Sequence, residues 1–332
     1  MPADDRFLVT GALGCIGAWT VRELVREGTP VVAFDLAADA RRLRLIMSPD
    51  ELAAVTFATG DITDSAVVER LLDEHRITHI VHLAALQLPY CRADPALGAR
   101  VNVVGTINVF EAARRRLDQV RGLVYTSSIA VFDAADADAR TGAVSDETPG
   151  HPTTHYGVYK QANEGSARVY WRESGLASVG LRPMTVFGPG RDQGLTSAPT
   201  KAVVAAVVGR PFEIGFSGRT LFQYTSDLGG TLIIAARSGL DGARILNLGG
   251  TSAAIAEVVA AIEAVVPGAV DLIRISGDPL PFPDEIDPSG ARVLGPLPIT
   301  PLERAVAETA ELFRRLQAEG RLDPVEHGLP AG

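Results

Sequence analysis

The chain has 332 residues, 46% of them hydrophobic, and a formal net charge of −9. This length and apolar content can bury a full core, and we expect two closely joined lobes rather than two independent domains. The negative charge argues against a polyanionic partner such as nucleic acid. Two cysteines, Cys15 and Cys91, provide neither a disulfide framework nor a metal-ligand cluster. With an acidic N-terminus and no apolar run of membrane-spanning length, we expect a cytoplasmic protein without a metal site and without a membrane partner.

Residues 6–17, RFLVTGALGCIG, predict a buried strand, a tight turn and the start of a helix. Gly11 can adopt the backbone angles of the turn, Gly14 lets the chain approach a pyrophosphate, and Gly17 lets the helix pack closely on the strand. The amides at the helix N-terminus would then face an anion. Glycines also serve ordinary turns, so the neighbouring sequence has to support a dinucleotide site.

That support comes from the next strand, at 31–34, which follows a predicted helix at 18–27 and ends in Asp35. A carboxylate about twenty residues beyond the glycine turn can accept hydrogen bonds from both ribose hydroxyls of NAD. The alternative for Asp35 is a solvated strand end or a helix cap. We expect NAD rather than NADP unless Arg41 or Arg42 pairs with a 2′-phosphate.

The first half of the chain continues to alternate strands with helices. Further strands are predicted at 53–60, 77–83, 122–126 and 177–181, and helices at 65–75, 99–116 and 156–173. This alternation implies a parallel sheet covered on both faces. We therefore predict an α/β fold: a doubly wound parallel Rossmann sheet with a smaller C-terminal α/β substrate lobe. Residues 1–181 would form the NAD-binding domain, with 222–248 returning to it, and residues 182–332 the substrate lobe. His79 and His82, beside one strand, are interpreted as packed residues.

The segment 155–160, HYGVYK, has the pattern of a catalytic pair. Tyr156 and Lys160 are four residues apart and share one face of a helix. A tyrosine with a pKa near its usual value of about 10 is a poor base. A nearby ammonium and a positive nicotinamide ring favour the phenolate. Such pairs are common by chance, but this one follows Ser128 by roughly thirty residues in a chain that already has a nucleotide turn. Tyr159 lies on another helix face and is assigned to packing.

The glycine spacing after Thr10, the Ser128–Tyr156–Lys160 set and the segment NVVGTIN at 102–108 resemble the extended short-chain dehydrogenase/reductases, in particular the NAD-dependent epimerase/dehydratase family of sugar-nucleotide 4-epimerases. The resemblance implies that Ser128 orients a substrate hydroxyl, Tyr156 exchanges its proton, and Lys160 tunes Tyr156 and holds the nicotinamide ribose. For Asn108 we favour a structural role. The cofactor contacts implied are Gly11, Gly14, Cys15, Ile16, Gly17, Asp35, Asp61, Ile62, Leu83, Ala84, Ala85, Asn102, Tyr156 and Lys160.

Departures from the family pattern bear on the substrate. Ile129 and Ala130 replace the Asp and Glu of the dehydratases, so elimination of water is set aside. Thr185 replaces an asparagine that contacts the diphosphate of a nucleotide sugar, and Thr220 and Leu221 replace an Arg-Asp pair. A diphosphate without such donors is poorly compensated, which favours a smaller sugar or sugar acid. The expected substrate contacts are Gln87, Ser128, Thr185, Arg191 and Arg219, with Arg191 able to reach a single carboxylate.

Three functions therefore remain open. The first is an NAD-dependent dehydrogenase or epimerase acting at a secondary alcohol of a sugar or sugar acid. The second is a UDP-hexose 4-epimerase, and the third is a non-catalytic NAD-binding regulatory protein. We also expect a homodimer through 99–116 and the helix from 156, because both carry apolar residues on more than one face; the alternative is a monomer whose second lobe covers them. These residues are Val101, Val104, Phe110, Val158, Ala162 and Val169.

Overall fold

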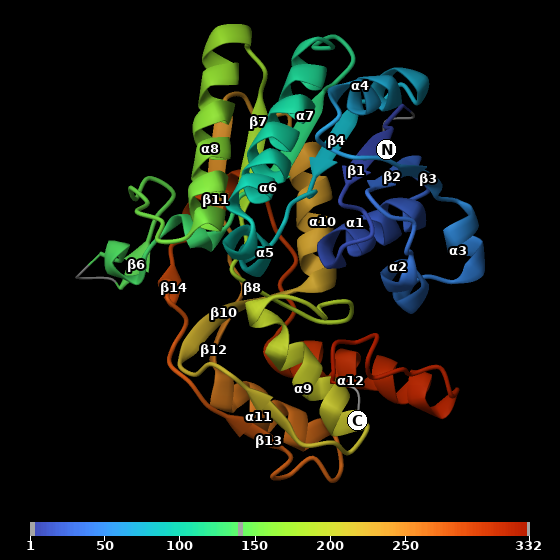
Figure 1. Ribbon diagram of the computed structural model, residues 1–332, viewed down its shortest axis with the longest axis vertical. Helices are drawn as coiled ribbons and strands as arrows, with labels where there is room; N and C mark the ends of the chain where they lie inside the picture. The colour runs from blue at the N-terminus through green and yellow to red at the C-terminus, as the bar shows by residue number, and fades with distance from the viewer. Residues whose placement is uncertain (1–3, 139–141, 331–332) are drawn as a thin grey trace.

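The computed structural model describes residues 4–138 and 142–330. Its main sheet has seven parallel strands in the order β11-β7-β5-β4-β1-β2-β3 (Figure 1). The chain builds outward from β1 in both directions, which is the doubly wound arrangement that the sequence predicted. The strands are β1 (Phe7–Thr10), β2 (Val31–Asp35), β3 (Thr56–Thr59), β4 (His79–His82), β5 (Gly122–Thr126), β7 (Ser178–Arg182) and β11 (Ala243–Asn247).

Helices cover both faces of this sheet. On one face α1 (Cys15–Arg26) packs against α10 (Thr225–Ala236), with α2 (Arg41–Ile46) and α3 (Pro49–Ala53) beside them. On the other face α4 (Ser65–Glu74), α7 (Gly105–Arg114) and α8 (His155–Ser174) pack side by side. The five inner strands, β1, β2, β4, β5 and β7, are almost fully buried, as expected of a parallel sheet with two covered faces. The edge strand β3 is largely exposed, and its Phe57 is 48% exposed.

The segment predicted as one helix at 99–116 is divided. Helices α5 (Leu88–Ala93) and α6 (Pro95–Ala99) lead into a π-helical turn, Arg100–Val104, before α7 begins. In that turn the Gly105 amide donates to the Arg100 carbonyl. The carbonyl of Asn102 accepts from Thr106 Oγ1 at 2.7 Å and from Asn163 Nδ2 at 2.9 Å. A single π-helical turn leaves the hydrophobic periodicity almost unchanged, so the sequence pattern did not reveal it.

The smaller lobe is built on a three-stranded sheet, β12-β10-β8, in which β10 is antiparallel to β12 and parallel to β8. Its core packs this sheet against three helices. Two short parallel pairs, β13-β9 and β14-β6, complete it. The remaining strands are β6 (Ala143–Val144), β8 (Thr185–Phe187), β9 (Phe212–Ile214), β10 (Arg219–Tyr224), β12 (Thr251–Ala254), β13 (Ile273–Ile275) and β14 (Glu285–Ile286), and the helices are α9 (Ala198–Val207), α11 (Ile255–Val265) and α12 (Leu302–Ala318), with 3-10 turns at Ile129–Val131, Ala134–Asp136, Leu195–Ser197 and Ser289–Leu294.

The chain crosses between the two sheets after β7. Residues 222–224 lie in β10 of the smaller sheet, α10 returns to pack on α1, and β11 joins the main sheet. Our division at residue 181, with 222–248 returning, remains a working proposal.

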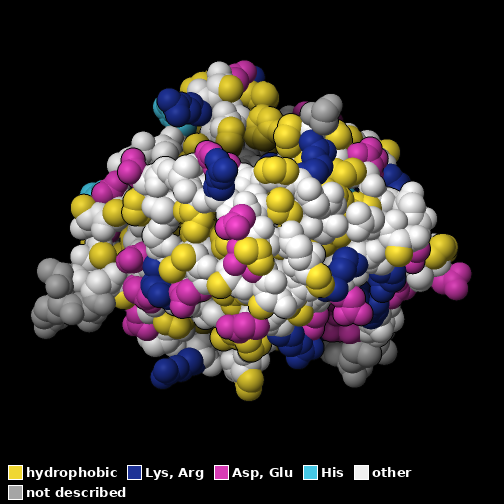
Figure 2. Space-filling model, turned by 90° about the horizontal axis from the view of Figure 1, so that it is seen from below, with side chains coloured by type: hydrophobic (Ala, Val, Ile, Leu, Met, Phe, Trp, Pro, Cys, Tyr) yellow, Lys and Arg dark blue, Asp and Glu magenta, His cyan; other side chains and the backbone are white. Residues whose placement is uncertain are grey.

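Residues 319–330, which follow α12, are docked on the smaller lobe. Leu329 is buried in the core of the smaller lobe, His327 packs its ring 5.0 Å from that of Phe313, and Arg210 Nη2 donates to the Pro330 carbonyl at 2.9 Å. The composition of this polar segment does not indicate that one of its side chains, Leu329, is buried. Among the described residues, no helix combines the length and apolar content needed to cross a membrane. On the face seen in Figure 2, basic and acidic side chains are interspersed.

Candidate active site

The glycine turn has the geometry of a nucleotide cradle. Gly11 has a φ of +67°, and a β-carbon there would lie 2.7 Å from the Ala84 amide nitrogen. A β-carbon at Gly17 would collide with the Gly11 carbonyl. Gly14 precedes α1 and, within the described part of the chain, no side chain caps this helix. The helix begins at Cys15, three residues earlier than predicted. Because none of the described side chains caps it, the amides of its first turn are available to a phosphate. The geometry of the turn therefore fits NAD.

Asp35 is fixed at the end of β2 by two amides. Its Oδ2 accepts from the Leu13 amide and its Oδ1 from the Leu36 amide, both at 2.8 Å. An ionised carboxylate has about four acceptor positions, so capacity for two ribose hydroxyls remains. The position that the sequence proposed for the adenosine ribose therefore fits the dinucleotide.

A polar chain inside the sheet shapes the next segment. The Thr10 hydroxyl accepts from the Leu83 and Ala84 amides, both at 3.2 Å, and lies 2.7 Å from His82 Nδ1. His82 Nε2 lies 3.0 Å from Thr106 Oγ1. Because Thr10 already accepts, we assign its proton to the bond with Nδ1, which makes Nε2 the donor to Thr106. Burial lowers the pKa of His82 to about 3, so this packed histidine is neutral.

Asn102, expected at the cofactor, is buried and fully occupied. Its amide accepts from the Leu86 N–H at 2.7 Å and donates to the Leu86 carbonyl at 2.9 Å. The side chain therefore braces the loop that follows Leu83, Ala84 and Ala85, and a direct cofactor contact has no donor left.

Asp61 and Ile62, proposed for the adenine, follow β3. Asp61 is exposed and accepts from the Thr63 amide at 2.8 Å, whereas Ile62 is buried. Asn108 Nδ2 donates to the Ile62 carbonyl at 3.0 Å, which is the structural role expected for Asn108. Both residues stay candidates for the adenine end.

Ser128, Tyr156 and Lys160 come together where β5 meets α8. The Ser128 hydroxyl accepts from the Ala130 amide at 3.1 Å and is close enough to the Tyr156 hydroxyl to lower the pKa of Tyr156. Gly157 makes this approach possible, because a β-carbon there would collide with the Ala130 carbonyl. The first turn of α8 can therefore lie against the loop that carries Ser128.

Lys160 lies under the tyrosine rather than beside its hydroxyl. Its Nζ is 5.7 Å from the centre of the Tyr156 ring and donates to the Thr126 carbonyl at 2.6 Å. Burial lowers the pKa of Lys160 to about 8. Burial also raises the pKa of Tyr156, while the Ser128 hydroxyl and the Arg191 cation act in the opposite direction. The contribution of Arg191 was not foreseen from the sequence. Tyr159 donates to the Pro95 carbonyl at 2.8 Å, which fits its packing role.

Two of the residues expected at the substrate meet at Gly194. A β-carbon there would collide with Gln87 Oε1 and lie 3.3 Å from Arg191 Nη2. Arg191 Nη2 donates to Thr196 Oγ1 at 2.9 Å, whereas its buried Nε has no partner among the described residues. Arg191 also lowers the pKa of Tyr156 by its charge, so an incompletely paired guanidinium lies within electrostatic range of the candidate base.

Thr185 and Arg219 have other partners. The Thr185 hydroxyl is buried 2.8 Å from that of Thr220, so the two threonines satisfy each other. Arg219 forms an exposed ion pair with Glu257 at 3.0 Å. Side chains alternate along a strand, so Arg219 and Thr220 point to opposite faces of β10. Direct substrate contact by Thr185 and Arg219 remains a hypothesis, and these contacts do not favour it.

A buried ion pair that sequence reasoning did not single out supports the site from behind. Arg182 donates to both carboxylate oxygens of Glu164 at 2.8 Å, and both side chains are 3% exposed. Ser127 Oγ donates to the same carboxylate at 2.5 Å. The pair thus connects α8, β7 and the residue before Ser128. Glu164 lies four residues after Lys160, and this spacing was the one available signal.

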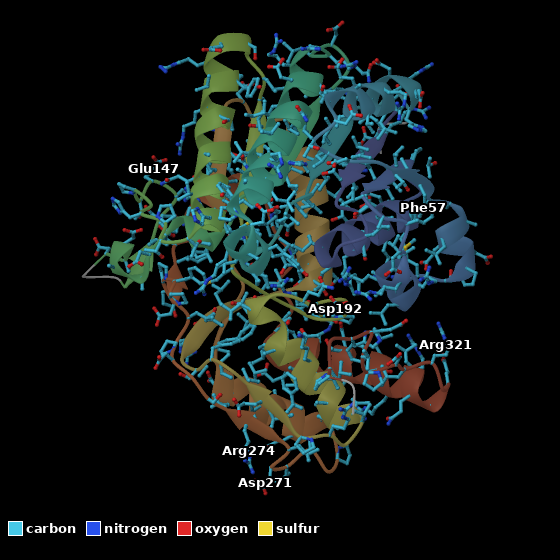
Figure 3. The ribbon with its side chains drawn as sticks, in the orientation of Figure 1. Phe57, Glu147, Asp192, Asp271, Arg274 and Arg321 are labelled. Atoms are coloured by element: carbon cyan, nitrogen blue, oxygen red, sulfur yellow. The ribbon has the colours of Figure 1, made fainter. Side chains whose placement is uncertain are left out.

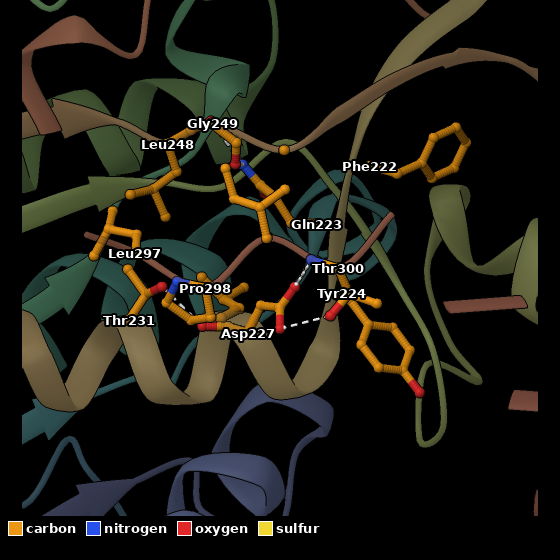
Figure 4. A pocket seen from close by; sticks show the side chains of 13 residues that line it. Phe222, Gln223, Tyr224, Asp227, Thr231, Leu248, Gly249, Leu297, Pro298 and Thr300 are labelled. Carbon is orange, nitrogen blue, oxygen red and sulfur yellow. Dashed lines mark hydrogen bonds between the residues drawn. The ribbon is translucent and has the colours of Figure 1, made fainter. Parts of the chain in front are cut away.

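A small cavity beside β10 and α10 is a poor candidate for a substrate site. Asp227 accepts from the Thr300 amide at 2.5 Å and from its hydroxyl at 3.0 Å, which holds the segment before α12 (Figure 4). The enclosed space is about 30 Å³, sufficient for water but not for a sugar. Within the described ranges, no group of three or more His, Cys, Asp or Glu residues has the arrangement of a metal site.

A fold with a glycine turn, a ribose carboxylate and a Ser-Tyr-Lys set defines an NAD-dependent short-chain dehydrogenase/reductase. The chain belongs to the NAD dependent epimerase/dehydratase family, whose model matches residues 7–249. It is an enzyme family that uses NAD, which confirms the fold, class and cofactor expected from the sequence.

The chain is similar to several known members. It is 32% identical over 328 residues to a UDP-glucose 4-epimerase of Mycolicibacterium smegmatis, covering 93% of this chain and 98% of the relative. It is 30% identical over 264 residues to UDP-glucuronate 4-epimerase 5 of Arabidopsis thaliana, covering 74% and 60%. Among solved structures, a partial-consensus L-threonine 3-dehydrogenase superposes with a TM-score of 0.80 at 25% identity, covering 93% of this chain and 99% of that one.

Proposed function

We propose that this enzyme oxidises a secondary alcohol of a carboxylate-bearing sugar, either as a net dehydrogenase or as an epimerase that returns the hydride to the opposite face. The observation that carries the choice of substrate is Arg191. It is a partly buried guanidinium whose Nε has no partner among residues 4–138 and 142–330, and it lies near Gln87 and within electrostatic range of Tyr156. A planar guanidinium matches a carboxylate well, and one cation suits one such group.

The chain's own residues divide the work as follows. The Ser128 hydroxyl acts on the pKa of Tyr156, so a substrate hydroxyl accepted between the two residues would be oriented toward both oxygens. Tyr156, as phenolate, takes the hydroxyl proton while the carbinol carbon loses hydride, and the product is a ketone. NAD, when bound, supplies the hydride acceptor. Lys160, anchored on the Thr126 carbonyl, places a positive charge beneath the Tyr156 ring and favours its ionised form.

The names of the relatives differ in whether their substrates carry a carboxylate, a nucleotide or both. UDP-glucuronate and L-threonine, named for two of the proteins above, both carry a carboxylate. UDP-glucose, named for the relative matched over most of its length, does not. A UDP-hexose 4-epimerase is therefore the second candidate, and the occupied Thr185, Thr220 and Arg219 side chains count against it. The intact catalytic set counts against a non-catalytic NAD sensor.

The test offers purified enzyme and NAD a panel of free aldoses, uronic acids, aldonic acids, threonine, UDP-glucose and UDP-glucuronate. NADH absorbance detects net oxidation. Epimerisation produces no net NADH, so it is detected by proton NMR of the sugar. We expect turnover of at least one carboxylate-bearing substrate, reduced by Arg191→Ala through a higher KM. Turnover of UDP-glucose alone, or micromolar binding of uridine diphosphate that Arg219→Ala abolishes, would establish the 4-epimerase reading instead.

We further propose a cytoplasmic homodimer without a nucleic-acid or membrane partner. Of the residues predicted at the dimer contact, Val104, Val158 and Val169 are 45–47% exposed. Phe110 is instead buried, with its ring 5.5 Å from that of Tyr125, and belongs to the core. The outward valines of the π-helical turn before α7 and of α8 carry this proposal.

A further inference from the structure

Asp192 lies between the two lobes, in the loop that follows β8 (Figure 3). Its side chain is 6% exposed, although it carries a charge. A carboxylate buried to this degree needs cationic partners, or its desolvation is uncompensated. Its position next to Arg191 would not by itself suggest a role toward the cofactor.

The partners of Asp192 are two arginines at the start of α2. Arg42 donates to Asp192 Oδ1 from Nη2 at 2.7 Å and from Nε at 3.2 Å, and Arg41 Nη2 lies 3.7 Å from Oδ2. The other contacts of Arg42 are carbonyls: Nη1 donates to Leu13 at 3.0 Å and Nε to Gly190 at 3.2 Å. All three guanidinium nitrogens of Arg42 are therefore engaged.

These contacts bring Arg42 to the region of the ribose carboxylate. The Leu13 carbonyl accepts from Arg42, while the Leu13 amide donates to Asp35 at 2.8 Å. Leu13 of the glycine turn therefore lies between the Asp35 carboxylate, which favours NAD, and the Arg42 guanidinium. A guanidinium near this carboxylate is the usual means of accommodating a 2′-phosphate.

We propose that Asp192 is a cofactor-specificity residue. It holds Arg42 on the loop of the smaller lobe and so withholds this cation from a 2′-phosphate. Arg41 lies 3.7 Å from Asp192 and 3.5 Å from Asp39, so it is shared between two carboxylates. For Arg42 to pair with that phosphate it would have to leave Asp192, and a buried carboxylate would lose its hydrogen-bonded partner. Rejection of NADP therefore rests on repulsion by Asp35 and on this occupied arginine together.

The inference rests on the NAD cofactor and not on the substrate, so binding alone can test it. Calorimetry would measure the Kd of NAD and of NADP for the wild type, Asp192→Asn, Arg42→Ala and the double variant. We expect Asp192→Asn to lower the Kd of NADP by about tenfold, because the released Arg42 can pair with the 2′-phosphate. The Kd of NAD should change by less than about threefold. The gain should disappear in the double variant.

Glu257→Gln is the matched control, since it removes a carboxylate paired with an arginine, Arg219, in the same lobe. It changes the net charge equally and should leave both affinities unchanged. Arg42→Ala alone should not weaken NADP binding, because the proposal holds that Arg42 is unavailable in the wild type. This variant keeps the test valid even if Asp192→Asn fails to fold.

Two results would overturn the proposal. One is an unchanged NADP affinity in an Asp192→Asn protein whose circular dichroism and NAD affinity are normal. The other is weaker NADP binding in Arg42→Ala, which would mean that Arg42 already contacts the phosphate.

Discussion

The replacement Tyr156→Phe removes one oxygen from the centre of the site and leaves the ring in place. Its removal can cost the folded protein at most one hydrogen bond, to the nearby Ser128 hydroxyl, which keeps the Ala130 amide as a donor. One such bond contributes about 0.5–1.5 kcal/mol net, so the melting temperature should fall by a few degrees at most. NAD affinity should be nearly unchanged. Loss of the proton acceptor should lower turnover by about a hundredfold to ten-thousandfold, or about 3–5 kcal/mol of activation free energy.

The assay follows NADH formation, or the epimerised product by NMR, at saturating substrate, together with a thermal melt and an NAD titration. Tyr159→Phe is the matched control, since its hydroxyl donates to the Pro95 carbonyl on another face of α8. It loses a comparable hydrogen bond without touching Ser128, and its turnover should be normal. Retention of turnover within about fivefold in Tyr156→Phe, or an equal loss in Tyr159→Phe, would refute the assignment of the base.

Three further changes test other parts of the structure. Burial lowers the pKa of His82 to about 3. Between pH 6.5 and 3 the unfolded chain binds more protons than the folded protein, so the free energy of unfolding falls as the pH drops through this window. In His82→Asn, urea unfolding should show a shallower decline of this free energy with acid. Gly157→Ala should separate Ser128 from Tyr156, lowering kcat while NAD still binds, as calorimetry and kinetics would show; normal kcat would contradict the close approach of α8. Val104→Glu with Val158→Glu should convert a dimer to a monomer in sedimentation, and a wild-type monomer at micromolar concentration would disprove the dimer.

Local spacing accounts for what the sequence predicted well. The glycine turn, the carboxylate after β2 and the Tyr156–Lys160 pair each depend on residues a few positions apart on one element, where backbone geometry fixes what they can reach. The parallel sheet followed from the alternation of strands and helices. The position of Ser128 against Tyr156 joins two elements and followed from the family resemblance, and Gly157 beside the tyrosine allows the helix to approach.

Contacts between distant segments were beyond the sequence. Arg42 pairs with Asp192, which lies 150 positions away in the sequence. Arg182 pairs with Glu164, so its guanidinium is not available to a substrate. Arg219 was grouped with Thr220 because they are adjacent, yet alternation along a strand sends adjacent side chains to opposite faces. In each case the partner is chosen by tertiary packing, and residue type alone cannot say which carboxylate an arginine will meet.

The electrostatics of the site lead to a last prediction, that binding of NAD releases protons. Without cofactor, burial raises the pKa of Tyr156, and burial lowers the pKa of Lys160 to about 8. Each group therefore holds a proton over part of the range in which the enzyme would work. The oxidised nicotinamide ring is positive, and a positive charge near either group lowers its pKa, so both lose protons more readily.

By linkage, the affinity for NAD should then rise with pH from about 7 to 9, whereas NADH, whose ring is neutral, should show a weaker dependence. Calorimetry in two buffers of different ionisation enthalpy counts the protons released. Lys160→Met should remove the part of the release that centres near pH 8. Equal proton release with NAD and NADH would mean that the ring charge does not reach Tyr156 and Lys160, and the activation of the tyrosine by the cofactor would have to be abandoned.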